Sequence, residues 1–209
     1  AVIHKALNYW FTAKPVCLNW WYNQIGIPKT LGTVFILFEK QLTPVEKQNA
    51  ITVMENAKFG MTGQNKVWLA GNVMMRALLQ NDYELVKMAR DTIASEIVTG
   101  GTEGIKDDWC FHQHGAQQQF GNYGLSFVSG MSFFSGLFSG TSLAFDDKQL
   151  SILSTLIDKG YRWVIWKGMM DVNALGRQLF HHAPVHKALS LAFAASELGG
   201  GESDECMAV

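Results

Sequence analysis

The sequence predicts an all-α protein built from antiparallel helical hairpins. In most segments, apolar residues recur at the three- and four-residue spacing of a helix, and no segment shows the strict alternation of a strand. Successive helical segments joined by loops favour antiparallel helical hairpins. The 209 residues are enough for one domain with a sizeable core.

Start and stop signals divide the first half of the chain into helices. Pro15 stops the first helix, and Gly26 and Pro28 predict a loop before the second. Thr43 and Glu46 form a capping box around Pro44, which predicts the start of a third helix. The predicted helices of this half are His4 to Ala13, Leu31 to Lys40 (a helix or buried apolar run), Thr43 to about Ala57, and Val67 to Leu79.

The second half is divided in the same way. Asp82 and Asp146 are predicted N-caps, and Thr99 to Gly104 is a glycine-rich loop. Gly168 to Gly176 is another loop, and the tail from residue 199 is expected to be disordered. The predicted helices of this half are Asp82 to about Val98, Leu125 to Phe145, Asp146 to Lys159, and Val185 to Glu197.

Leu125 to Phe145 carries no charged residue, so a membrane span has to be weighed. Serine and glycine recur through it every three or four positions, with phenylalanine and leucine between them. Such small residues let neighbouring helices approach closely, and a real span is usually more apolar. We therefore expect a buried helix and no membrane partner.

Charge and cysteine content exclude some classes of protein. The formal net charge of −1 gives no global signature of nucleic-acid binding. The three cysteines are an odd set without metal-ligand spacing, and they do not make a disulfide framework. The chain begins without Met and without a signal-peptide pattern, so we expect a processed or truncated chain.

The stretch from Asp107 to Gly124 is the strongest candidate for a functional site. It holds His112, His114 and Tyr123 between two strongly helical segments, and its glycines predict irregular backbone. Functional groups are often carried by such loops between rigid elements. Every second loop of stacked hairpins falls at the same end, so Asn19–Trp21, Phe59–Asn65 and His114–Tyr123 are predicted to converge.

Three motifs, in order, resemble those of polysaccharide lyase family 8, which includes chondroitin AC, hyaluronate and xanthan lyases. The sequence Asn19-Trp20-Trp21 followed by Ile25-Gly26-Ile27-Pro28 resembles the family's NWW…IG(V/I)P signature. Thr62-Gly63-Gln64-Asn65 resembles its TGxN motif, and Phe111 to Gly115 with Tyr123-Gly124 resembles its DGSFxQHG…YG block. The similarity runs over most of the chain.

The resemblance implies an incomplete (α/α) toroid over residues 1–198, a fragment of a larger protein. A β-sandwich region normally follows the toroid and adds a glutamate to the cleft. The resemblance also implies a secreted or periplasmic bacterial enzyme that needs no metal or cofactor. Its substrate would be an acidic polysaccharide, such as chondroitin or hyaluronan, cleaved by β-elimination.

The resemblance carries roles to particular residues. Asn65 matches the amide that hydrogen-bonds the uronate carboxylate, and His114 would assist it or act as base. Tyr123 matches the base and acid of the family. A cation near this hydroxyl would favour the phenolate, and Arg177 is the candidate. Taken alone, Asn65 suits a turn or helix cap, and Arg177 suits a surface ion pair.

A second group of residues is predicted to bind substrate. Trp20, Trp21 and Phe59 resemble the aromatic patch that positions the sugar chain, while Asn19 and Gln113 could hydrogen-bond sugar hydroxyls. Two departures from the family pattern matter. The family's DGSF reads Asp108-Trp109-Cys110-Phe111 here, so its glycine and serine are replaced, and His181 stands where the family has a second arginine.

Other functions were weighed against a lyase. A binding module could hold a sugar chain through the tryptophans without turning it over. A glycoside hydrolase needs a paired carboxylate acid and base, and the loop acids near the motifs are few. His182 and His186 have the i, i+4 spacing of metal ligands, but the sequence offers no third ligand.

Overall fold

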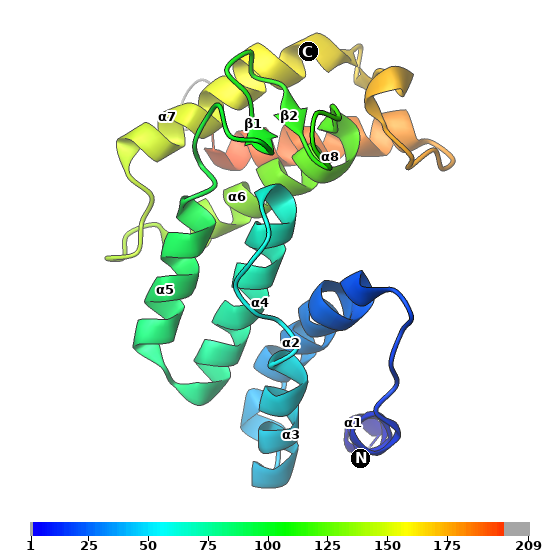
Figure 1. The fold of residues 1–209 in the computed structure, drawn as a ribbon, viewed down its shortest axis with the longest axis vertical. Helices are drawn as coiled ribbons and strands as arrows, with labels where there is room; N and C mark the ends of the chain where they lie inside the picture. The colour runs from blue at the N-terminus through cyan, green and yellow to red at the C-terminus, as the bar shows by residue number, and fades with distance from the viewer. Residues whose placement is uncertain (1, 199–209) are drawn as a thin grey trace. The chain divides into compact units, whose positions relative to one another are not determined.

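A computed structural model of the chain describes residues 2–198, and they are mainly helical, as Figure 1 shows. The all-α prediction is confirmed. The α-helices are α1 (Val2–Ala13), α2 (Ile27–Leu37), α3 (Pro44–Met54), α4 (Gly63–Gln80), α5 (Tyr83–Ala94), α6 (Leu125–Phe138), α7 (Asp147–Thr155) and α8 (Ala183–Leu198).

The structure adds two short hairpins that the sequence analysis missed. Strand β1 (Gly104–Ile105) pairs antiparallel with β2 (Phe111–His112), and β3 (Ile165–Trp166) pairs with β4 (Met169–Met170). Strands of two residues are too short to show an alternating pattern, so periodicity could not reveal them.

The predicted caps are confirmed. Thr43 and Glu46 form a reciprocal capping box at the start of α3, and Asp146 and Gln149 form another at α7. Asp82 Oδ1 accepts a hydrogen bond of 3.0 Å from the backbone N–H of Leu85. The predicted ends are less accurate, since α3 ends at Met54 and α5 at Ala94, before the positions expected.

The predicted loop at Gly26 to Pro28 is wrong. Tyr22–Gly26 forms a π-helical turn that runs directly into α2, and Pro28 lies in the first turn of α2. Proline is tolerated there because the first backbone N–H groups of a helix have no intrahelical partner. Pro184 likewise lies in the first turn of α8, one residue after its start.

Helix α6 is shorter than predicted. It ends at Phe138, and Gly140 follows with a φ of 70°, a conformation that breaks the helix. Within residues 2–198, none of the helices combines the length and the apolar character that a membrane crossing requires.

Contacts divide the chain into two compact units. The first holds residues up to 61 together with 68–93, and the second holds 62–67 and the residues from 94 onward. The single domain predicted over 1–198 stays a prediction. The predicted disordered tail, 199–209, lies outside the described residues.

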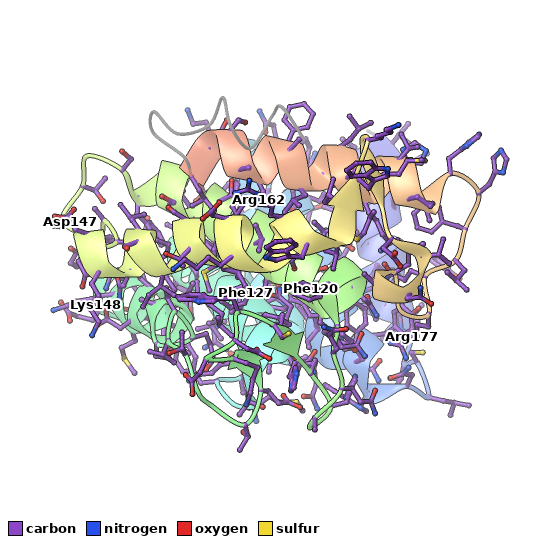
Figure 2. The ribbon with its side chains drawn as sticks, turned by 90° about the horizontal axis from the view of Figure 1, so that it is seen from above. Phe120, Phe127, Asp147, Lys148, Arg162 and Arg177 are labelled. Atoms are coloured by element: carbon purple, nitrogen blue, oxygen red, sulfur yellow. The ribbon has the colours of Figure 1, made fainter. Side chains whose placement is uncertain are left out.

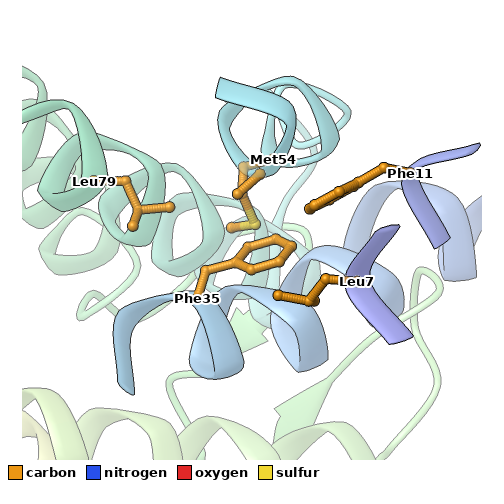
Figure 3. Packing of buried hydrophobic residues seen from close by; sticks show 6 residues of the cluster. Leu7, Phe11, Phe35, Met54 and Leu79 are labelled. Atoms are coloured by element: carbon orange, nitrogen blue, oxygen red, sulfur yellow. The ribbon is translucent and has the colours of Figure 1, made fainter. Parts of the chain in front are cut away.

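Each unit has its own apolar core. In the first unit, side chains from α1, α2, α3 and α4 pack together, as Figure 3 shows for Leu7, Phe11, Phe35, Met54 and Leu79. In the second unit, α6 packs against α8, and α7 also contacts α8 (Figure 2).

Candidate active site

The site in the second unit begins at the start of helix α4. Gly63 has a φ of 58°, and a Cβ atom there would collide with Oε1 of Gln113. A side chain at position 63 is therefore excluded twice, by backbone conformation and by contact. Residues 63–65 belong to the first turn of α4, so the predicted turn from Phe59 to Asn65 extends too far.

Asn65 lies in this first helical turn and is buried, with 5% of its surface exposed. Among residues 2–198, no group donates a hydrogen bond to its amide oxygen. Buried polar atoms are normally paired, and an exception indicates a place where a water or ligand can bind. Asn65 is therefore a candidate ligand-binding amide as well as a helix residue.

His114 lies at the tip of a closed turn. The backbone N–H of Gln113 donates to the carbonyl of Gln117 (3.1 Å), and that of Gln119 donates to the carbonyl of Phe111 (2.8 Å). His114 itself has a φ of 60° and Gly115 a φ of 76°. A histidine in the left-handed region is uncommon, so the surrounding bonds must hold it there.

Tyr123 is carried by a π-helical turn, Phe120–Gly124, which leads into α6. Glycine is required on both sides of it. A Cβ atom at Gly121 would lie 2.6 Å from the carbonyl oxygen of Ala174, and one at Gly124 would lie 2.5 Å from Oη of Tyr161. The turn is thus held close to its neighbours, and π-helical turns are frequent at functional sites.

These elements bring three predicted residues together. Nε2 of His114 lies 3.1 Å from Oη of Tyr123, and the two rings meet edge to face with centroids 5.0 Å apart. Nη2 of Arg177 donates to the same hydroxyl over 3.5 Å, a long hydrogen bond. The Tyr123 side chain is buried, and its hydroxyl contacts both an imidazole and a cation.

Arg177 reaches the site from an exposed loop (Figure 2). Gly176, just before it, has a φ of 65°, and a Cβ atom there would lie 3.6 Å from Cβ of Asn122. The loop is stabilised by Asp171, whose Oδ1 accepts from the backbone N–H of Asn173 at 2.7 Å. The loop therefore passes directly beside the turn that carries Tyr123.

Lys187 of α8 was missed by the sequence analysis. Its side chain is buried, and Nζ donates to the carbonyl of Gly121 and to Oε1 of Gln178 (2.6 Å). Burial lowers the pKa of this ammonium group. Lys187 thus ties the Tyr123 turn to the Arg177 loop. A lysine in a helical pattern gives no sign of burial, so the sequence held no signal for it.

Glu103 was also missed. It lies in the glycine-rich loop and is bonded to Thr62, Gln113 and Gly115. The only signal in the sequence was an acidic residue among glycines, which is weak evidence on its own.

The predicted aromatic patch belongs to the first unit. Trp20 is 42% exposed and Phe59 38% exposed, whereas Trp21 packs edge to face on Trp68 with ring centroids 5.5 Å apart. One tryptophan of the pair is thus exposed and the other packed against a neighbouring ring. Oδ1 of Asn19 accepts from the backbone N–H of Trp21 at 3.0 Å. Their substrate-binding roles stay predictions.

The remaining predicted residues have other contacts. Gln113 is 1% exposed, and its amide bonds to the backbone N–H of Gln64 (2.9 Å) and to the carbonyl of Thr62 (3.3 Å). Its predicted bond to a sugar hydroxyl stays untested. His181 is exposed and lies against His182, with ring centroids 3.7 Å apart. In the part of the chain that is described, no cluster of His, Cys, Asp or Glu is arranged for a metal.

Comparison with known proteins decides the family. The model of "Polysaccharide lyase family 8, N terminal alpha-helical domain" matches residues 1–196. The chain belongs to polysaccharide lyase family 8. It is 31% identical to chondroitinase-AC of Pedobacter heparinus over 84% of this chain and 26% of that protein. It is 27% identical to a xanthan lyase of Bacillus sp. over 82% of this chain and 19% of that protein.

Solved structures of family 8 lyases share the fold. A chondroitinase AC lyase studied with oligosaccharides superposes with a TM-score of 0.84 and 27% identity, over 97% of this chain and 31% of that one. A Paenibacillus xanthan lyase, at 22% identity, superposes with a TM-score of 0.83. The predicted toroid class is confirmed. The chain spans between a fifth and a third of the length of these relatives.

Proposed function

We propose that the protein containing this chain is a lyase that cleaves a uronic-acid-containing polysaccharide, such as chondroitin or hyaluronan, by β-elimination. The observation that carries the proposal is the pair of contacts at Tyr123. Its hydroxyl lies 3.1 Å from an imidazole nitrogen of His114 and 3.5 Å from the guanidinium of Arg177. The relatives named chondroitinase-AC and hyaluronate lyase support this substrate class.

β-Elimination at a uronic acid needs a base and an acid. The base removes the weakly acidic proton at C5, next to the carboxylate, and the C4–O bond to the leaving sugar then breaks. A double bond forms between C4 and C5, and the leaving oxygen takes a proton. Tyr123 can supply both steps, because its phenolate would accept the C5 proton and its hydroxyl could return a proton to the leaving oxygen.

The other groups adjust the charge around this reaction. The positive charge of Arg177 stabilises a phenolate at Tyr123 through their direct contact. The amide of Asn65 can hydrogen-bond the uronate carboxylate without adding a second negative charge, which stabilises the carbanion-like transition state. His114 would assist by holding the Tyr123 hydroxyl and by facing the substrate from its exposed turn.

Substrate positioning is assigned to the first unit and to the Arg177 loop. The exposed rings of Trp20 and Phe59, together with Trp21, suit stacking against sugars. His181 would stand in for a second substrate-binding arginine. A polymeric substrate also favours a place outside the cytoplasm, secreted or periplasmic.

The test is a substrate screen with the full-length parent protein. Chondroitin, hyaluronan, xanthan and alginate are offered separately, and the ultraviolet absorbance of the unsaturated uronate product is followed. We expect the absorbance to increase with chondroitin or hyaluronan. Saturable binding to all uronate polymers without any growth would instead identify a binding module.

A further inference from the structure

Glu103 bonds to two segments that carry predicted catalytic groups. Oε2 accepts from the hydroxyl of Thr62 at 2.5 Å, three residues before Asn65. The same oxygen accepts from Nε2 of Gln113, and Oε1 accepts from the backbone N–H of Gly115 at 3.0 Å. The residue between Gln113 and Gly115 is His114. Both neighbours of the histidine are therefore bonded to one carboxylate.

We propose that Glu103 is a positioning residue that fixes His114 against Tyr123 and ties it to the helix turn of Asn65. The inference rests on the proposed lyase function, because it assigns Glu103 a part in that reaction. The hydrogen bonds of Glu103 go to Thr62, Gln113 and Gly115. We therefore infer that it acts by holding the turn that carries His114, rather than on the substrate.

The backbone of the turn explains why such a residue is needed. His114 has a φ of 60° and Gly115 a φ of 76°, two successive residues in the left-handed region. For a non-glycine residue this conformation is strained and persists only where the surroundings enforce it. His114 is exposed apart from its edge-to-face contact with Tyr123, so packing gives its backbone little restraint. The hydrogen bonds that Glu103 accepts from Gln113 and Gly115, on either side of His114, can provide it.

The chemistry of the contacts requires a carboxylate. Three donors face Glu103: a backbone N–H, an amide N–H and a hydroxyl. An ionised carboxylate only accepts, so it can satisfy all of them at once. An amide at the same place would turn an N–H group either towards the amide nitrogen of Gln113 or towards the backbone N–H of Gly115, and in both orientations a donor would face a donor.

Gln113 completes the connection to helix α4. Its Oε1 accepts from the backbone N–H of Gln64 at 2.9 Å, and its Nε2 donates to Glu103. The side chain is buried, with 1% exposed. A change at Glu103 therefore reaches both the histidine turn and the first turn of α4.

The test compares two variants of the full-length parent protein. Glu103→Gln keeps the shape and reverses one hydrogen bond. The exchange Glu103→Gln with Gln113→Glu restores a donor–acceptor pair between the two positions and keeps the net charge. Glu55→Gln, an exposed carboxylate at the end of α3, is the matched control. Two quantities are measured: kcat and KM on chondroitin or hyaluronan, and the rate at which diethyl pyrocarbonate modifies His114, followed by peptide mass spectrometry.

For Glu103→Gln we expect kcat to fall on the order of 10- to 100-fold, because small misplacements of catalytic groups have effects of this size. KM should change less than kcat, since Glu103 contacts none of the aromatic residues assigned to sugar stacking. Modification of His114 should become at least about threefold faster as its turn loosens. The exchange variant should slow the modification again. Its kcat should recover only in part, because Gln113 also donates to the carbonyl of Thr62 and a glutamate cannot.

Unchanged kcat and an unchanged rate at His114 in Glu103→Gln would overturn the inference. So would a loss of kcat that the exchange variant leaves as large as before. If the unaltered parent cleaves none of the polymers, the proposed lyase function fails. The modification rate of His114 still decides whether Glu103 fixes this turn.

Discussion

The hydroxyl of Tyr123 is the single atom on which the proposed chemistry depends. The ring is buried, whereas His114 and Arg177 reach the hydroxyl from exposed loops. A phenylalanine would keep the packing of the ring and remove only the proton-transfer group. The effects on folding and on chemistry can therefore be separated at this residue.

We expect Tyr123→Phe to lower turnover on the order of 10³-fold or more, because one group supplies both proton transfers. Binding of the polysaccharide should remain within a few-fold of the unaltered protein. The measurements are product absorbance and equilibrium binding, with Tyr9→Phe on the exposed face of α1 as control. Unchanged turnover would remove Tyr123 from the mechanism.

Gly121 has no room for a side chain. A Cβ atom there would meet the carbonyl oxygen of Ala174 at 2.6 Å and Cα of Leu175 at 2.8 Å, and backbone atoms cannot move aside cheaply. We expect Gly121→Ala to lower the free energy of unfolding by about 1–3 kcal/mol.

Gly130 is the matched control for this substitution, measured in the same urea titrations. It lies in helix α6, and its Cβ would meet only a methyl group of Val67 at 4.0 Å. Gly130→Ala should therefore stabilise the helix by about 0.5–1 kcal/mol. Equal effects of the two variants would show that the close contact at Gly121 relaxes without cost.

For single residues, the motifs identified the chemical groups of the site but not the residues that hold those groups in place. His114, Tyr123 and Arg177 were predicted from the family resemblance, and the structure brings them into contact. Glu103 and Lys187 escaped prediction because their partners are backbone and amide groups far along the chain. Such bonds follow from the fold and leave no local pattern.

Among the elements, the start of α3 offers a test of how pH affects stability. Glu46 accepts from the backbone N–H of Thr43 at 2.9 Å, from its hydroxyl at 3.0 Å, and meets Nδ1 of His4 at 2.9 Å. These bonds, the first above all, lower the pKa of the Glu46 carboxyl from its ordinary value of 4.5.

The direction in which pH changes the stability follows from proton linkage. A carboxyl whose pKa is lower in the folded state than in the unfolded state stabilises the fold at pH values above the unfolded-state pKa. This contribution is lost as the pH falls through the folded-state pKa. We expect Glu46→Gln to lower the melting temperature at pH 7. The variant should also lose less stability than the unaltered chain on acidification below pH 4.5.

Thermal unfolding at pH 7 and pH 3 measures this difference, with Glu55→Gln as the control carboxylate. The same acid dependence in Glu46→Gln and in the unaltered chain would show that the capping box is formed without help from the charge.

Local signals predicted where helices start better than where loops lie. Capping boxes at Thr43 and Asp146 depend on neighbouring residues, and both are present as expected. Gly26 and Pro28 indicated a loop, yet packing of the Trp21 ring near Gly26 and the N-terminal place of Pro28 fit them into a helix. Both residues are thus compatible with the helix at the positions that they occupy.

For the molecule as a whole, the three motifs identified the family, and the match to residues 1–196 confirmed it. Hydrophobic periodicity and capping signals alone would have given only an all-α protein. The placement of Thr62–Asn65 in one unit with His114 and Tyr123 agrees with the predicted convergence of these two loops. The arrangement of the Asn19–Trp21 loop around the same substrate stays a prediction.

The length of the chain sets the last prediction. It spans 26% of the chondroitinase-AC relative, and the resemblance implies a further glutamate from a β-sandwich region. Loss of one catalytic hydrogen-bonding group typically costs on the order of 10²–10³ in rate. We therefore expect the isolated 209-residue chain, once circular dichroism shows cooperative unfolding, to bind chondroitin oligosaccharides but turn them over at least ~100-fold more slowly than the full-length parent.

Tryptophan fluorescence measures the binding, and product absorbance measures the turnover. Equal turnover would mean that Tyr123, His114, Asn65 and Arg177 suffice for the reaction. Absence of binding would mean that the exposed aromatic residues of the first unit need the rest of the protein to hold a sugar chain.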